Sequence, residues 1–207
     1  MPVTPVQRGL SEDQLADEPM TQFARWMADA LASGMPEPTA MVLSTVTGEG
    51  RPRARTVLLK AHDRDGFTFY SNRTSRKGRE LAGNPSACLV FPWYGIDRQV
   101  IAEGTVRELS PAQSEPYFRS RPRGSQIGAW ASRQSTVIAS RAVLDDRYAE
   151  LQQRWPEPEA VPMPGFWGGY LLEPDAVEFW QKGACRLHDR LRYRRADGGW
   201  AVDRLSP

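Results

Sequence analysis

The chain is poor in the residues that usually build metal centres and disulfide frameworks. Its 207 residues include two cysteines, Cys88 and Cys185, and two histidines. Two cysteines do not make the framework of a small secreted domain, so we expect a reducing, cytoplasmic environment. A zinc site needs several His, Cys or carboxylate ligands, and the arginines around His188 would repel a cation. We therefore expect no metal site.

Long hydrophobic runs are also missing. No apolar stretch approaches the roughly 20 residues that span a bilayer. The N-terminal sequence MPVTPVQRGLSEDQ lacks the apolar segment of a secretory signal. We therefore expect no membrane partner.

Neither sign of charge dominates the composition. The 27 basic and 25 acidic residues give a net charge of +2, which is too balanced for a protein that coats a polyanion. Glycine-rich dinucleotide and P-loop motifs are absent, as are a Gly-x-Ser-x-Gly elbow and a Ser-His-Asp order. We expect no nucleic-acid partner, and any basic site must be local.

What the sequence does contain is a succession of short β-rich segments and amphipathic helices. Residues 1–18 are polar and show no periodicity, so we expect a flexible arm, followed by a single domain over 19–207. Helices are expected over 19–34, from Ser75 to Gly83, from Ser110 to before Pro122, and over 141–155. Strands are expected over 40–46, 51–60, 67–71, 86–93, 98–109, 166–174 and 176–181, and in a hairpin over 190–205. This pattern predicts an α+β fold built on an antiparallel sheet or barrel.

A first basic cluster lies in SNRTSRKGRE, residues 71–80. Arg73, Arg76, Lys77 and Arg79 surround the expected start of a helix, where free N–H groups and the helix dipole favour an anion. The pattern indicates a phosphate site, and a solvated basic surface is the alternative. In the preceding RARTVLLK, alternation places Lys60 on the face opposite to the arginines unless the strand ends before it.

Two further segments combine aromatic and basic residues. YFRSRPRGSQIGAWASRQS, residues 117–135, is compatible with nucleic acid, with a phosphorylated aromatic small molecule, or with a helical surface over one buried tryptophan. EFWQKGACRLHDR, residues 178–190, places His188 among arginines. Trp180 is expected in the core by default, and His188 is either a structural histidine or part of an anion site.

Taken together, these segments resemble the pyridoxamine 5′-phosphate oxidase family, FMN enzymes that make pyridoxal 5′-phosphate. The resemblance runs from about Leu15 to Pro207. It is carried by RTVLLK, FYSN..SRK, FPW....RQV, YF.SRPR.SQIGAW.S.QS, FWGG, EFWQ....RLHDR and the DRLSP ending. It implies an FMN-binding split β-barrel, antiparallel and Greek-key-like with surrounding helices, that works as a homodimer with FMN at the interface.

The resemblance also implies roles for individual residues. The positions that match FMN contacts are Arg55, Thr56, Val57, Leu58, Leu59, Lys60, Tyr70, Ser71, Arg76, Lys77, Gln99, Gln134, Ser135, Trp180 and Arg190. Those that match the group holding the substrate phosphate are Lys60, Tyr117, Arg121 and Ser125. Arg186 and His188 match the pair placed over the substrate ring, and they are the candidate catalytic residues.

The implied chemistry is an oxidation of pyridoxine or pyridoxamine 5′-phosphate. A hydride passes from substrate C4′ to the flavin N5, and dioxygen reoxidises the flavin to give hydrogen peroxide. The flavin carries the redox chemistry, so the protein supplies positioning and electrostatics.

One departure and several rival functions accompany the resemblance. Family members often carry an N-terminal Arg-Glu-Tyr-type stretch over the substrate, and nothing similar precedes Gly9 here. We therefore expect weaker substrate retention. A phenazine-pathway oxidase on the same barrel, a flavin or pyridoxal-phosphate carrier without turnover, and a nucleic-acid-binding module are the alternatives. The SRPRGSQIGAW segment favours the phosphorylated substrate.

Overall fold

The computed structural model describes residues 9–207. Its α-helices are α1 Pro19–Ala32, α2 Arg76–Gly83, α3 Pro111–Ser120, α4 Arg123–Ala131 and α5 Ala142–Arg154. Its strands are β1 Ala40–Val46, β2 Pro52–Leu58, β3 Ala61–Asp63, β4 Gly66–Asn72, β5 Ser86–Trp93, β6 Arg98–Glu108, β7 Trp167–Gln181, β8 Asp189–Ala196 and β9 Gly199–Arg204. Short 3₁₀ turns are η1 Glu12–Gln14, η2 Tyr94–Ile96 and η3 Ala184–Arg186. Within the described part of the chain, no helix combines the length and the apolar character needed to cross a membrane.

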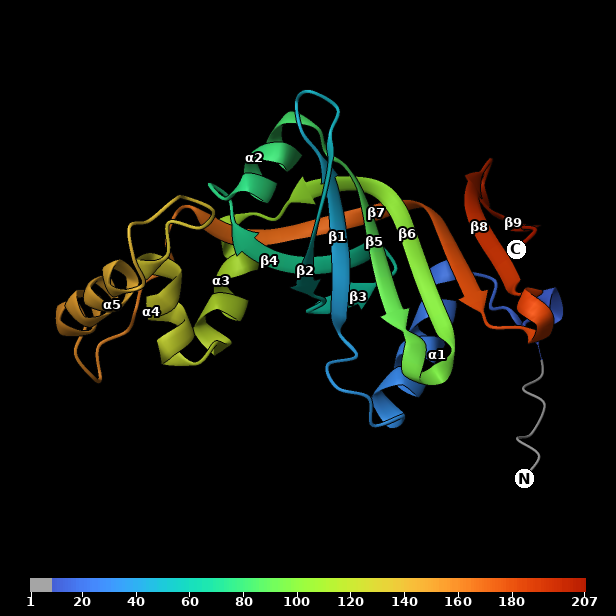
Figure 1. Cartoon of the computed structure of the whole chain (residues 1–207), viewed down its shortest axis with the longest axis horizontal. Helices are drawn as coiled ribbons and strands as arrows, with labels where there is room; N and C mark the ends of the chain where they lie inside the picture. Colours follow the sequence, from blue (N-terminus) through green and yellow to red (C-terminus); the bar gives the residue numbers. More distant parts are fainter. Residues whose placement is uncertain (1–8) are drawn as a thin grey trace.

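The strands form one curled antiparallel sheet in the order β2-β1-β5-β6-β7-β4-β3. Strand β7 also pairs with β8, which pairs with β9, so the sheet divides along β7. Figure 1 shows the curled sheet with α3, α4 and α5 at one end of the molecule and the β8–β9 hairpin at the other. The α+β antiparallel barrel is therefore as expected.

Strand β7 is continuous where the sequence predicts two strands. The predicted break follows Pro174, and proline cannot donate a ladder hydrogen bond. In the structure Gly104 pairs with Pro174 and Glu103 with Ala176, so Asp175 is an extra residue in a β-bulge. A bulge interrupts the ladder locally, which lets the strand pass through a proline.

The main core fills the curled sheet and is closed by α1. Phe23 of α1 is fully buried, and its ring centroid lies 4.8 Å from that of Phe67 and 4.9 Å from that of Phe91. Trp26 packs edge-on against Phe179 of β7 at 5.1 Å. The amphipathic pattern of 19–34 is thus explained by burial of one helix face against the strands.

Residues 9–18 lie against the barrel, whereas the sequence predicts a flexible arm there. Leu10 is buried in the main core, its N–H donates to Asp189 Oδ2 at 3.0 Å, and its carbonyl accepts from Arg204 Nη2. These partners are about 180 or more positions away in the sequence, which is why local polarity gave no sign of them. The remainder of the expected arm, residues 1–8, lies outside the described residues, and so does the expectation about a substrate-covering segment there.

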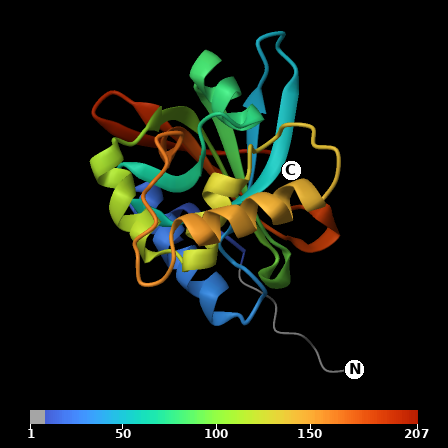
Figure 2. The ribbon, with the colours of Figure 1, turned by 90° about the vertical axis from the view of Figure 1, so that its left-hand side faces the viewer.

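Helices α4 and α5 share a small second core. It is formed by Ile127, Ala131, Leu151, Trp155 and Val161. Viewed from this end of the molecule, α5 crosses in front of the neighbouring helices (Figure 2). Helix α4 was not among the predicted helices, and the predicted end of α3 before Pro122 is confirmed. Pro122 divides them, because the residue before a proline disfavours helical backbone and Arg121 is extended at φ −70° and ψ 146°.

Candidate functional site

A cavity of about 350 Å³ opens between β2, β4, α2 and the end of α3. Four cationic side chains line it, from Arg55, Lys60, Lys77 and Arg121. Its other lining residues are Thr56, Val57, Leu58, Tyr70, Ser71, Tyr117, Gln134 and Trp167. This one cavity therefore gathers much of the set that the family resemblance implied, from four segments distant in sequence.

The position at which β2 ends explains how both Arg55 and Lys60 come to line the cavity. The strand ends at Leu58, and Leu59 then turns into the main core with 4% exposure. Lys60 follows beyond the strand end and reaches the cavity, so the alternation that placed it on the opposite face no longer applies. Leu59 matches the family pattern as a residue of the run, but it does not line the cavity.

Helix α2 brings Lys77 to the cavity wall. Ser75 caps the helix by accepting a hydrogen bond from the Gly78 N–H at 3.2 Å, as the sequence predicted. Lys77 Nζ donates to Gln134 Oε1 at 2.8 Å and to Ser71 Oγ at 3.2 Å. Burial lowers the pKa of Lys77, and the charge of Arg55 lowers it further. The cavity therefore has an excess of positive charge that a bound anion would offset.

Stacked aromatic rings form another wall of the cavity. The rings of Tyr70 and Tyr117 lie 4.1 Å apart between centroids, and Tyr70 stacks on Trp167 at 5.3 Å. The guanidinium of Arg121 lies 5.0 Å from the centroid of Trp167. Burial lowers the pKa of Arg121. Its Nη1 is buried and has no hydrogen-bond partner within residues 9–207, although the residue itself lines the cavity.

An adjoining cavity of about 330 Å³ extends toward α4. It shares Tyr70, Ser71, Arg121, Gln134 and Trp167 with the first and adds Ser125. Ser125 sits in the first turn of α4, beyond Pro122. The break between α3 and α4 thus lets Tyr117, Arg121 and Ser125 approach the same space from two helices.

A second cluster of predicted residues lies on β6, β7 and β8. Gln99 is directly opposite Trp180, and Trp180 is directly opposite Arg190, so the three side chains share one face of the sheet. His188 packs on Trp180 with ring centroids 4.7 Å apart, and its Nδ1 accepts the Gly183 N–H at 3.2 Å. Trp180 is half-buried, so the default expectation of a core tryptophan is wrong.

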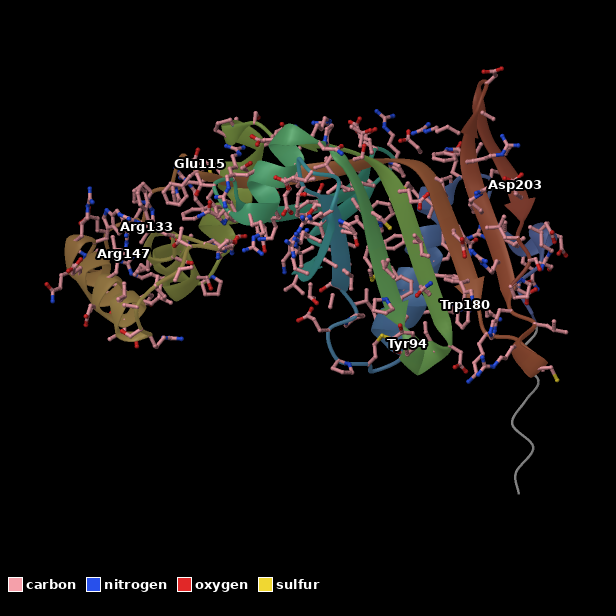
Figure 3. The ribbon with its side chains drawn as sticks, turned by 45° about the horizontal axis from the view of Figure 1, so that its top comes forward. Tyr94, Glu115, Arg133, Arg147, Trp180 and Asp203 are labelled. Atoms are coloured by element: carbon pink, nitrogen blue, oxygen red, sulfur yellow. The ribbon has the colours of Figure 1, made fainter. Side chains whose placement is uncertain are left out.

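Nothing in this second cluster lines the two cavities. Figure 3 places Trp180 toward the β8–β9 end of the molecule, while Arg133, just before Gln134, lies toward the helical end. Arg186 is exposed, with a positive φ of 64°, in the turn between β7 and β8. One chain therefore does not bring Arg186 and His188 to the cationic cavity.

Two predicted residues lie next to cavity-lining residues in the sequence but do not themselves line either cavity. Arg76 is the first residue of α2 and is exposed, and Ser135 follows Gln134 with a φ of 72°. Trp167 is the converse case, because it lines both cavities but was not among the predicted site residues. Its position in the FWGG motif was the available signal.

Two sequence models of known families match the chain. Residues 27–155 match the model described as "Pyridoxamine 5'-phosphate oxidase". Residues 167–207 match "Pyridoxine 5'-phosphate oxidase C-terminal dimerisation region". The chain belongs to the pyridoxamine 5′-phosphate oxidase family. Both clusters described above fall within the matched ranges.

Curated relatives cover almost the whole chain. A pyridoxine/pyridoxamine 5′-phosphate oxidase of Frankia alni is 59% identical over 203 residues, covering 96% of this chain and 84% of the relative. A protein of the same name from Salinispora arenicola is 55% identical over 200 residues, covering 96% and 90%. These relatives and the two family models confirm the family expected from the motifs.

The chain is also similar to a solved structure that contains a ligand other than a B6 vitamer. PhzG from Burkholderia lata 383, in complex with tetrahydrophenazine-1-carboxylic acid, is 33% identical and superimposes with a TM-score of 0.91, covering 98% of this chain and 99% of that one. An FMN-binding protein from Nostoc punctiforme related to this oxidase family shares the fold, with a TM-score of 0.73 at 17% identity. The split-barrel fold is confirmed.

Proposed function

We propose that this chain is an FMN-dependent oxidase that converts pyridoxine or pyridoxamine 5′-phosphate to pyridoxal 5′-phosphate, with dioxygen as the final acceptor. The observation that carries the proposal is the gathering of four cationic side chains, those of Arg55, Lys60, Lys77 and Arg121, around one cavity. Names of relatives above 50% identity support the same activity. When bound, FMN supplies the two-electron redox chemistry, which the chain's own side chains do not provide.

The cavity residues fit FMN by charge. A phosphate group is an anion, and Arg55 and Lys77 lie where α2 and β2 meet. The 55–60 run, Tyr70, Ser71 and Gln134 would hold the cofactor together with these cations. Arg76 and Ser135 would join them from their neighbouring positions.

The substrate would be held mainly through its own phosphate. Lys60, Tyr117, Arg121 and Ser125 would bind that group, and the Tyr70–Tyr117–Trp167 stack offers a flat apolar surface beside it. Binding energy from a remote phosphate can orient the ring that reacts. Arg186 and His188 would cover the ring and fix its orientation.

A homodimer would join the two clusters. The pocket of one copy would then meet Gln99, Trp180, Arg186, His188 and Arg190 of the other. The match of 167–207 to a dimerisation region supports this arrangement. So does the 72% exposure of Leu187, an apolar side chain between Arg186 and His188 that a single chain leaves uncovered.

A visible spectrum taken without oxygen tests the proposal. The purified protein should show a flavin spectrum that bleaches when pyridoxine 5′-phosphate is added and recovers in air as the aldehyde appears. A flavin spectrum that ignores both phosphorylated vitamers would contradict the proposal. Failure to take up FMN at all would also contradict the cofactor assignment.

A phenazine-pathway oxidase is the second candidate, because PhzG has nearly the same backbone. Its ligand, as named, carries a carboxylate and no phosphate. The four-cation cavity suits a doubly charged phosphate better. Bleaching by tetrahydrophenazine-1-carboxylic acid, but not by pyridoxine 5′-phosphate, would favour this candidate.

A further inference from the structure

Glu80 is a buried carboxylate directly behind the wall of the cationic cavity. It lies on α2, one turn after Lys77, and its side chain is 7% exposed. It is not among the residues that line the cavity, and it was not among the predicted site residues although it ends the 71–80 stretch. Burying a carboxylate without a partner costs free energy, so the groups that pair with Glu80 indicate its role.

Those partners form a closed triad with a cavity-lining arginine. Arg55 Nη2 donates to Glu80 Oε2 at 2.9 Å, and Arg55 Nη1 donates to Thr45 Oγ1 at 2.5 Å. Thr45 Oγ1 in turn donates to Glu80 Oε2 at 2.5 Å. Arg55 Nη1 also reaches the Leu43 carbonyl at 3.2 Å. The guanidinium is therefore fixed from β1 and from α2 at the same time.

The triad also places a negative charge next to the cations of the cavity. Glu80 raises the pKa of Lys77, opposing the larger effects of burial and of Arg55. Thr45 is 1% exposed, so water does not compete for the hydroxyl. The two carboxylate oxygens of Glu80 differ in their hydrogen bonding. Oε2 accepts from Arg55 and Thr45, whereas Oε1 has no partner within the described chain. The hydrogen bonds that Glu80 makes are therefore those of the triad that orients Arg55.

We propose that Glu80 is a positioning residue for FMN binding, which acts by holding the Arg55 guanidinium at the cavity wall. This rests on the proposed function, because it takes FMN to be the ligand of that wall. A comparable arrangement recurs in the second cluster, where Glu178, with an 11% exposed side chain, accepts two hydrogen bonds from Arg190 at 2.8 and 3.0 Å. In both places an arginine matched to FMN is hydrogen-bonded to a largely buried carboxylate.

The test is a double-mutant cycle on FMN affinity. Full-length protein is freed of flavin and titrated with FMN, with quenching of flavin fluorescence as the readout. Glu80→Ala should weaken binding by about tenfold, and Glu80→Gln, which keeps an acceptor oxygen, by about threefold. In an Arg55→Met background both effects should shrink to less than about twofold, because Glu80 then has no guanidinium to orient.

Two results would overturn the inference. One is an equal loss of affinity in both backgrounds, which is what a purely structural role in packing α2 would give. The other is unchanged affinity in Glu80→Ala with Arg55 present. If Glu80→Ala or Arg55→Met does not fold, Glu80→Gln and Arg55→Lys complete the same cycle, since lysine lacks the planar fork.

A matched control comes from the surface of the sheet. Glu173 pairs with Arg107 at 2.5 Å, with both side chains 46% exposed, and Glu173→Gln should leave FMN affinity unchanged. The outcomes also separate this inference from the proposed function. A wild-type chain that binds no FMN contradicts the function itself, whereas a wild-type chain that binds FMN without coupling between Glu80 and Arg55 contradicts only the positioning role.

Discussion

Arg121 shows most directly how one residue's surroundings point to a ligand. Its guanidinium lies over the ring of Trp167 at 5.0 Å and near Phe118 at 5.6 Å, and Nη1 is buried without a partner among the described residues. A buried donor left unpaired costs free energy. Because Arg121 also lines both cavities, its guanidinium is positioned to pair with an anion bound there.

Replacing Arg121 should weaken substrate binding more than FMN binding. Hydrogen bonds to charged groups contribute roughly 1.5–3 kcal/mol, so Arg121→Ala should raise KM for pyridoxine 5′-phosphate by about 10- to 100-fold. Steady-state kinetics with FMN saturating measures this. Arg119→Ala is the matched control, because Arg119 is exposed near the end of α3, two residues before Arg121, and its side chain pairs with Glu115. A KM change of similar size in Arg119→Ala would contradict the specific role of Arg121.

For individual residues, the sequence predicted which side chains lie at the cavity better than it predicted the direction in which each one points. Lys60, Tyr117 and Arg121, named from the motifs, all line the cavity, whereas alternation left the direction of Lys60 dependent on where the strand ends. The end of β2 at Leu58 decided its direction, and a strand end cannot be located from side-chain alternation alone.

Helix α2 is the element on which the cavity's cationic wall depends. Its first turn packs closely on the preceding backbone, because a Cβ on Gly78 would lie 2.1 Å from the Arg73 carbonyl oxygen. Only glycine allows this approach. The position of Lys77 relative to β2 and β4 follows from it.

Gly78→Ala should therefore displace α2 and disturb the cavity. We expect a loss of about 1–3 kcal/mol in the free energy of unfolding, as for other forced overpacking, together with weaker FMN binding. Chemical denaturation and FMN titration measure the two effects. Gly83→Ala is the control in the same helix, because nothing lies within 4 Å of a Cβ there. Equal stability of the two variants would contradict the close-packing argument.

Elements with a strong local signal were predicted well, and those that depend on distant partners were not. The caps at Ser75 and Ser110 were readable because both are formed within four residues. The continuity of β7 was not, because the bulge that admits Pro174 is made with β6, about 70 positions earlier in the chain.

At the scale of the whole molecule, the first and last segments of the described residues are joined by hydrogen bonds. Arg204 of β9 contacts both oxygens of Glu12 at 2.9 Å and Asp189 Oδ1 at 2.7 Å. The hydrogen bonds from Arg204 lower the pKa of Glu12 to about 2, from an ordinary value of 4.5. This contact keeps residues 9–18 beside the second cluster.

The stabilisation from Glu12 should depend on pH in one direction. A carboxyl whose folded-state pKa is depressed stabilises the fold above its unfolded-state pKa, and the effect is lost as pH falls through the folded-state value. Glu12→Gln should therefore lower Tm slightly at about pH 7, and the difference from wild type should shrink steadily below about pH 4.5. Thermal melts across that range measure it. A difference that stays constant down to about pH 3 would contradict the assignment.

A mixed dimer tests whether the active site is shared between two copies. Chains carrying Arg121→Ala and chains carrying His188→Ala, each with very low activity alone, are produced together. Random pairing gives half heterodimers with one intact site of two, so about a quarter of wild-type activity should return. Placing both substitutions in one chain and mixing it with an inactive Arg121→Ala chain should restore none. The same low activity in both mixtures would contradict a shared site.

The sequence by itself determined the class of fold, the order of most strands and helices, and the family. Periodicity, caps and motifs involve residues close together in the sequence, so they can be recognised without the structure. Only the tertiary structure decided which of these residues meet. The curled sheet separates Tyr117 and Arg121 from Trp180 and His188, packs residues 9–18 against the last strands, and places Glu80 behind Arg55. Each of these contacts joins segments far apart in the chain, and their geometry follows from how the whole sheet closes around its core.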